Sequence, residues 1–160
     1  MGSFVFLVLA PGVVAGLVPW WLTRWHAGNT WLPLQLLGAV LLVCGVGVLL
    51  HAFARFVVEG VGTPAPVAPT ERLVVGGLYR YVRNPMYLAV AATIVGQALL
   101  LGRWILLPYA AAFLAAVAAF VRWYEEPTLR RQFGEQYEAY RRDVPAWLPR
   151  WRRGRHPRAG

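Results

Sequence analysis

The stretch Gly77-Leu78-Tyr79-Arg80-Tyr81-Val82-Arg83-Asn84-Pro85-Met86-Tyr87 leads directly into an apolar segment of membrane length. A second polar group, the pair Glu125-Glu126, follows the next apolar segment along the chain. The chain is 58% hydrophobic, and ionisable groups at membrane segments usually mark a functional site. We therefore expect both polar stretches to lie at one membrane face.

Around these stretches the apolar residues fall into four blocks, without a strand or amphipathic rhythm. The blocks are residues 5–22, 31–54, 86–101 and 104–121. A transmembrane helix needs about 20 residues. We predict an all-α integral membrane protein, a single domain over residues 1–160 with four transmembrane helices. Gly102-Arg103 alone separates the last two blocks, which predicts a tight helical hairpin over 86–123.

The first block is predicted to be a retained helix rather than a signal peptide, so that residues 1–54 hold the first two transmembrane helices. No basic residue precedes it, and Trp20-Trp21 is typical of an interfacial anchor. Pro11 and Pro19 predict kinks in this helix. The oligomeric state stays open, because four helices can be complete or can pack against a neighbouring copy.

The arginines indicate an orientation in the membrane. Arg24 and Arg103 fall in the two short loops of one side, and the other arginines fall on the opposite side. The positive-inside rule then predicts a multi-pass protein with both termini and the site in the cytoplasm. The net charge of +9 is concentrated beside the helices and in the tail 150–160, which favours lipid over nucleic acid as its partner. Cys44 has no partner for an intramolecular disulfide, and no metal site is predicted.

Two polar regions flank the predicted hairpin. The connection 55–85 is rich in Gly and Pro and ends at Asn84-Pro85, which predicts a helix start with Asn84 as the N-cap. In the arm 124–149, an apolar face recurs at helical spacing, which predicts one cytoplasmic amphipathic helix ended by Pro145. The residues of that face are Leu129, Phe133, Tyr137 and Tyr140.

The ends of the hairpin could hold a ligand of mixed charge. Free N–H groups after Asn84, together with Arg83, predict a pocket for a carboxylate or phosphate. Glu125 and Glu126 offer acceptors for an amine, a ribose diol or a positive centre. The aromatic faces of the stretch, those of Tyr79 and Tyr87, suit an adenine or a sulfonium.

Each of these groups also has a simpler interpretation. Asn-Pro is ordinary helix capping, and the tyrosines could belong to an interfacial belt. The glutamates could be solvated charges, or partners of Arg122 and Arg130 at helical spacing. Their combination at the two ends of one hairpin favours a site.

Five ordered elements between residues 64 and 149 resemble a known family. They are Gly77-Leu78-Tyr79 with Arg83-Asn84-Pro85-Met86-Tyr87, an apolar hairpin, Glu125-Glu126, Phe133-Gly134 with Tyr137 and Tyr140, and Val144-Pro145 with Pro149. In this order the chain resembles the membrane methyltransferases of the isoprenylcysteine carboxyl methyltransferase and phospholipid methyltransferase group. Asn84 stands where the family most often has His.

The resemblance implies a cofactor and a set of site residues. The cofactor would be S-adenosylmethionine, bound by Glu71, Leu73, Val74, Tyr79, Asn84, Pro85, Met86, Tyr87 and Glu125. Arg122 and Glu126 would act on the substrate or catalytic side. Asn84 cannot titrate near neutral pH as His does, so a proton-carrying role there would be lost.

The implied reaction is methyl transfer to a lipophilic acceptor that arrives from the membrane. An isoprenylcysteine-like carboxylate, a phospholipid amine and a small hydrophobic metabolite all remain possible acceptors. A carboxylate would need no base, whereas an amine would first have to lose a proton. A non-catalytic membrane scaffold of the same fold, or a sterol-reductase-like enzyme, are the alternatives.

Overall fold

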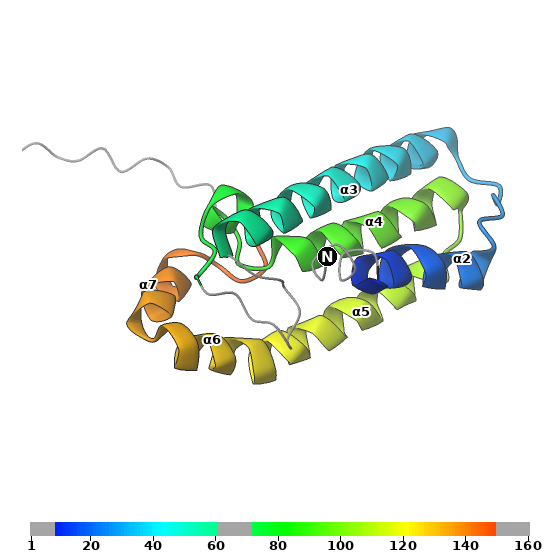
Figure 1. Ribbon diagram of the computed structural model, residues 1–160. Coiled ribbons are helices and arrows are strands. Elements are labelled where there is room, and N and C mark those ends of the chain that lie inside the picture. Colours follow the sequence, from blue (N-terminus) through cyan, green and yellow to red (C-terminus); the bar gives the residue numbers. More distant parts are fainter. Residues whose placement is uncertain (1–8, 61–71, 150–160) are drawn as a thin grey trace, which may run out of the picture.

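A computed structural model describes residues 9–60 and 72–149 of the chain (Figure 1). Within these ranges the regular elements are all helical, and there is no strand. In chain order they are η1 (Val13–Leu17), α2 (Val18–Thr23), α3 (Leu32–Gly60), η2 (Gly77–Arg80), α4 (Pro85–Leu101), α5 (Leu106–Phe120), η3 (Val121–Glu125), α6 (Glu126–Phe133) and α7 (Glu135–Asp143).

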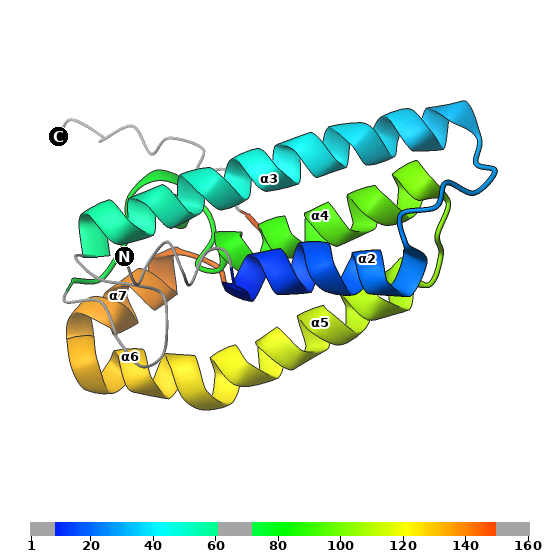
Figure 2. The ribbon, with the colours of Figure 1, turned by 45° about the vertical axis from the view of Figure 1, so that its right-hand side comes forward.

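Helix α4 lies at the centre of the bundle. It packs along α3 and also contacts α5 and η1 (Figures 1 and 2). Its residues Ile94 and Ala98 are fully buried, and Leu49, Leu106 and Ala110 belong to the same apolar cluster. In water, removal of this apolar surface from solvent would hold the helices together. In a lipid bilayer, close van der Waals packing between the helices takes that role.

The two ends of the bundle differ. The α2–α3 and α4–α5 connections meet at one end, where Gly28 N–H donates to Leu101 O at 2.7 Å. Arg103 Nε also donates to His26 O at 2.8 Å there. The segment 72–84, α6 and α7 gather at the other end (Figure 1). The turn between α4 and α5 is short: α4 ends at Leu101, Gly102 has a φ of 62°, and α5 begins at Leu106.

Two helical stretches are long and apolar enough to cross a membrane, Leu32–Glu59 and Leu106–Phe133. The other two apolar helices, Leu9–Thr23 and Pro85–Leu101, are shorter. The all-helical fold is thus confirmed for the described residues, while the count of four transmembrane helices stays a prediction. Large exposed aromatic residues cluster near the end away from α6 and α7, as an interfacial belt would. They are Trp20, Trp21, Trp25, Trp31 and Trp104.

The arm after the hairpin differs from the prediction of one amphipathic helix. Helix continues from α5 through η3 into α6 without a break, and ends at Phe133. Gly134 then adopts φ 53° and ψ −126°, a conformation that suits glycine, and α7 starts in a new direction. The arm is therefore two short helices, and the tail 150–160 lies outside the described residues.

Glycines let α3 and α4 approach closely. A Cβ at Gly96 would lie 2.7 Å from Leu42 N and 2.9 Å from Gly38 O, both of them backbone atoms of α3. A Cβ at Gly45 would meet Thr93 in the same way. Small residues at a helix contact are the usual device for close packing in membranes.

Gly96→Ala is expected to lower the free energy of unfolding by about 1–3 kcal/mol, because the added methyl forces two backbones apart. Gly47→Ala makes the same change on α3 where nothing lies within 4 Å. That control should be neutral or slightly stabilising, since alanine favours helix. Denaturant unfolding in detergent measures both, and equal stabilities would contradict the close approach described here.

Each of the two π-helical turns ends two residues before a proline. η1 precedes Pro19 and η3 precedes Pro127. Proline has no N–H to donate to the carbonyl four residues earlier, and its ring also crowds that carbonyl. For Pro19 this carbonyl belongs to Ala15, which instead accepts from Gln97 Nε2 at 2.6 Å. The structure thus has a π-turn where the sequence predicts a distortion at Pro19.

Gln97→Leu is expected to cost about 1–3 kcal/mol, because the Ala15 carbonyl would be left buried without a donor. Gln97 is 6% exposed and its Oε1 also accepts from Trp25 Nε1 at 3.1 Å. Gln136→Leu, at an exposed position of α7, is the matched control and should cost much less. Thermal unfolding in detergent would show the difference, and equal shifts for the two variants would argue against the Ala15 contact.

Candidate functional site

A small cavity lies where segment 72–84, η3, α6 and α7 meet. Its volume is about 70 Å³, and we call it the inner cavity. Residues from both polar stretches line it, so the structure brings together the two ends of the predicted hairpin. The lining residues are Leu73, Val74, Tyr79, Arg83, Asn84, Val121, Glu125, Glu126, Leu129, Tyr137 and Tyr140.

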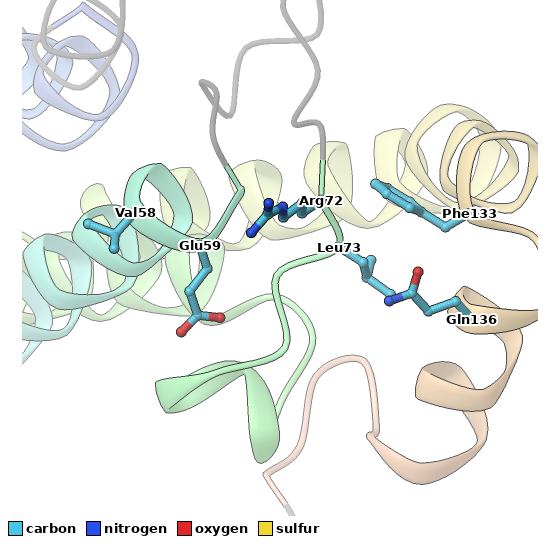
Figure 3. A pocket seen from close by; sticks show the side chains of 6 residues that line it. All are labelled: Val58, Glu59, Arg72, Leu73, Phe133 and Gln136. Atoms are coloured by element: carbon cyan, nitrogen blue, oxygen red, sulfur yellow. The ribbon is translucent and has the colours of Figure 1, made fainter.

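A larger cavity, the outer cavity, lies next to it and shares Leu73 as a lining residue. Its volume is about 440 Å³. Figure 3 shows the side chains around it, with Phe133 and Gln136 directed toward the 72–73 segment and Arg72 directed toward the end of α3. The lining residues are Val58, Glu59, Arg72, Leu73, Phe133 and Gln136.

Most of the predicted cofactor residues lie at the inner cavity. Leu73, Val74, Tyr79, Asn84 and Glu125 line it directly. Three further predicted residues lie at the start of α4, just behind this wall. Of these, Pro85 is buried, Met86 packs against the cluster of Ala52, Val74 and Tyr79, and Tyr87 OH donates to Glu125 Oε2 at 3.0 Å. Glu71 lies outside the described residues.

The two predicted catalytic residues differ in position. Glu126 lines the inner cavity and its side chain is 9% exposed. The Arg122 side chain is 68% exposed and lines neither cavity. Its NH1 lies 3.8 Å from Glu126 Oε2, one helical turn away, as the simpler interpretation of this pair predicts.

The π-turn η3 carries the acidic pair into the site. Four residues of the α5–η3–α6 helix line the inner cavity, namely Val121, Glu125, Glu126 and Leu129. The consecutive pair Glu125 and Glu126 stands at the junction of η3 and α6, with Glu125 as the last residue of the wide turn. π-turns of this kind are frequent at functional sites. Pro127 is the sequence signal for this turn, and the sequence analysis did not use it.

Arg83 is already paired within the protein. Its NH1 donates to Glu126 Oε1 at 2.9 Å and to Tyr137 OH at 3.1 Å, and its side chain is only 11% exposed. Arg141 NH2 approaches Glu126 Oε2 at 3.8 Å from α7. The sequence analysis expected Arg83 to bind the anionic group of a ligand. The Glu126 carboxylate takes that place instead, and the predicted anion pocket at Arg83 is corrected accordingly.

The chain after α7 closes over the start of α4. Asn84 Nδ2 donates to Ala146 O at 3.0 Å, and Arg83 N–H donates to Pro145 O at 2.9 Å. Helix α4 begins at Pro85 as predicted, but the Asn84 side chain makes no capping bond because its amide faces Ala146 instead. Asn84 thus ties the arm to the stretch Gly77–Tyr87.

Two tyrosines join η2 to α7. Tyr140 OH donates to Tyr79 O at 2.7 Å. Burial raises the pKa of Tyr140 well above its usual value, although Arg83 opposes this, and burial also raises the pKa of Tyr79. Both hydroxyls therefore stay protonated across the physiological pH range. The one hydroxyl proton of Tyr140 is donated to Tyr79 O, so Tyr140 offers the inner cavity only an acceptor oxygen.

The end of α3 holds the glycine turn that precedes η2. Glu59 Oε2 accepts from Gly76 N–H at 2.9 Å, and Glu59 Oε1 accepts from Arg55 NH1 at 3.0 Å. A Cβ at Gly76 would overlap the Glu59 carboxylate, and Gly77 has a φ of 56°. The backbone path thus favours glycine at Gly77, whereas at Gly76 an added side chain would displace the Glu59 carboxylate.

Sequence reasoning missed three of these contributors. Tyr137 and Tyr140 were assigned to the apolar face of a surface helix, yet both line the inner cavity. Their place in the tyrosine motif after Phe133-Gly134 was the available signal. Glu59 had no signal, because its partner Gly76 is 17 residues away.

Comparison with known families places the chain in one of them. The family described as phospholipid methyltransferase matches residues 34–136. That range is more than half of the 160 residues and includes most of α3, the stretch Gly77–Tyr87 and the pair Glu125-Glu126. No curated protein and no solved structure matches the chain. On the strength of the family match, the chain belongs to the phospholipid methyltransferase family.

Proposed function

We propose that the protein is a membrane methyltransferase that uses S-adenosylmethionine to methylate a lipophilic acceptor. The observation that carries the proposal is the inner cavity, because its wall combines the cofactor stretch, the acidic pair and the tyrosine motif of α7. The membership in a methyltransferase family supports the reaction type. The two membrane-length helices support a lipophilic acceptor.

The residues present fit this cofactor chemically. The inner cavity is far smaller than the 300–1,000 Å³ or so of ordinary ligand pockets, whereas the outer cavity falls within that range. A ligand that fills both would meet carboxylates, tyrosine hydroxyls, two arginines and one phenylalanine ring. S-adenosylmethionine would supply a methyl group on a positively charged sulfur. Glu71, which lies outside the described residues, is also proposed to bind the cofactor.

Glu125 is proposed as the carboxylate that faces the positive centre. Tyr87 fixes its orientation through a 3.0 Å hydrogen bond, so little reorganisation is needed when a ligand binds. Asn84 ties the arm over the start of α4, and water excluded by this contact would favour group transfer over hydrolysis. Glu126 is proposed to act at the acceptor side, where it also holds Arg83.

The acceptor is proposed to enter from the membrane. Exposed Trp123 and Tyr124 beside the acidic pair offer an apolar approach at this end of α5. Arg122, exposed on the same turn, is proposed to meet the polar head of the acceptor. In this arrangement the chain is multi-pass, and the site and both termini face the cytoplasm. Isoprenylcysteine-like carboxylates, phospholipid amines and small hydrophobic metabolites remain the candidate acceptors.

A labelled-methyl assay tests the proposal. The purified protein is incubated with S-adenosylmethionine that carries a radiolabelled methyl and with a lipid extract, and the labelled product is then identified. We expect label in the organic phase that depends on the protein. Calorimetry in detergent is run in parallel. Absence of binding at millimolar S-adenosylmethionine, together with absence of label, would reject the proposal and favour a non-catalytic scaffold.

A further inference from the structure

The end of the bundle away from both cavities carries two arginines, Arg24 and Arg103. Arg24 follows α2, and Arg103 lies in the turn between α4 and α5, so both stand where apolar helices end (Figures 1 and 2). The sequence has no Asp or Glu in residues 1–58 or in residues 84–124. Within the part of the chain that the structure describes, neither arginine forms an ion pair. The described residues thus leave the positive charge at this end unbalanced.

The Arg24 guanidinium is held against the ring of Trp20. Its Cζ lies over the ring, 5.3 Å from the centroid, as in a cation–π contact. The backbone at this point is in the left-handed region, with a φ of 51° at Arg24 and of 52° at Trp25. This conformation is unfavourable for residues that have a Cβ, and it persists where the surrounding structure fixes it, often at binding sites.

Two hydrogen bonds join the turn after Arg24 to the helices behind it. Trp25 Nε1 donates to Gln97 Oε1 at 3.1 Å. Arg103 Nε donates to His26 O at 2.8 Å. Because His26 is only two residues after Arg24, the second bond brings both arginines to the same turn. Both are therefore positioned before any ligand arrives.

The two guanidinium groups keep donors for a ligand. Arginine has five N–H donors in one plane. The bond from Arg103 to His26 O uses Nε alone, so the terminal Nη1 and Nη2 groups can donate elsewhere. Arg24 is exposed, so its N–H groups can also reach a ligand. Guanidinium groups pair with phosphate through two parallel N–H bonds, which makes a phosphate oxygen a fitting acceptor here.

The surroundings of the two arginines fit the headgroup level of a bilayer. Each is followed directly by an exposed tryptophan, Trp25 at 53% and Trp104 at 50% exposure. The two membrane-length stretches, Leu32–Glu59 and Leu106–Phe133, begin shortly after these tryptophans. Tryptophan is enriched where the hydrocarbon core meets the headgroups, and this is also the level of the lipid phosphates.

We infer that this end of the bundle binds an anionic phospholipid through its phosphate, with Arg24 and Arg103 as the donors. A zwitterionic phospholipid fits less well, because its cationic group would meet no carboxylate among the described residues at this end. The opposite end, which carries Glu125 and Glu126, has the reverse chemistry. The lipid site is separate from the proposed methyl transfer and does not depend on it.

Quenching of tryptophan fluorescence by brominated lipids tests the site on the full chain in neutral detergent. Bromine on the acyl chains quenches only nearby tryptophans, and five of the eight in the chain lie at this end. Phosphatidylglycerol and phosphatidylcholine with identical brominated chains are compared. The parent should reach half-maximal quenching at about tenfold less phosphatidylglycerol, given the attraction of arginines to anionic lipid.

Paired substitutions assign the preference to the two arginines. Arg24→Gln/Arg103→Gln should respond equally to the two lipids. Arg24→Lys/Arg103→Lys keeps the charge but loses the planar fork, and should keep part of the preference. Arg80→Gln/Arg142→Gln removes the same charge from exposed arginines at the opposite end and should behave like the parent. Arg24→Gln alone, at an exposed side chain, should lower the preference even where the double variant is unstable.

Three results would overturn the inference. The first is equal half-maximal quenching of the parent by the two lipids. The second is an equal loss of preference in the two double glutamine variants, since net charge would then govern binding. The third is full displacement of the lipid by glycerol phosphate at the same concentration, which would mark a site for a free phosphate. Because S-adenosylmethionine is absent from these measurements, none of the three bears on the proposed function.

Discussion

Arg83→Leu is expected to lower the free energy of unfolding by about 3 kcal/mol, the low end for breaking a buried ion pair. The Glu126 carboxylate would lose its 2.9 Å partner while its side chain stays 9% exposed. Two other guanidinium groups, those of Arg122 and Arg141, remain at 3.8 Å and moderate the loss. Denaturant unfolding in detergent is the measurement.

Two controls identify the cause of that loss. Arg80→Leu removes an exposed arginine three residues earlier and should change stability little. The double variant Arg83→Leu/Glu126→Leu removes both charges and should recover most of the stability, because no buried charge is left unpaired. A double variant as unstable as the single one would show that the ion pair is not what holds this region together.

Glu125→Ala is expected to weaken the binding of S-adenosylmethionine by about 10-fold to 100-fold, as for the loss of a hydrogen bond or ion pair to a charged group. The Glu125 carboxylate lines the inner cavity and is oriented by Tyr87. Tyr87→Phe removes only the orienting hydroxyl and should weaken binding less. Equilibrium dialysis with labelled S-adenosylmethionine measures both variants.

Glu135→Ala is the matched control for this series. Glu135 is an exposed acid at the start of α7 and lines neither cavity. The Glu135→Ala variant makes the same change in charge at the same end of the bundle. It therefore corrects for the long-range attraction between the protein and a cationic ligand. Equal losses in Glu125→Ala and Glu135→Ala would mean that net charge, rather than contact with Glu125, governs affinity.

The parts of the fold that were predictable depend on local signals. Proline at the first position of a helix and glycine after its last residue set the bounds of α4 at Pro85 and Gly102. The four apolar blocks predicted helices because apolar runs of that length have few alternatives. The pairing of the cofactor stretch with Glu125-Glu126 followed from the short turn between α4 and α5.

The parts that were missed depend on distant partners. Asn84 has the sequence of an ordinary cap, yet its amide binds Ala146, which is 62 residues away. Arg83 was assigned to a ligand because its partners Glu126 and Tyr137 lie on other elements. Gly134 interrupts a face that otherwise continues at helical spacing, and only its backbone conformation reveals the break.

Hydrogen exchange with and without S-adenosylmethionine tests the central claim most directly, because it locates the ligand on the full chain. The measurement compares amide exchange by mass spectrometry on the purified protein in detergent. We expect slower exchange in residues 72–88 and 121–140, and no change in the connections at the opposite end, 24–31 and 102–105. Protection confined to that opposite end, or no protection at saturating S-adenosylmethionine, would contradict the site described here.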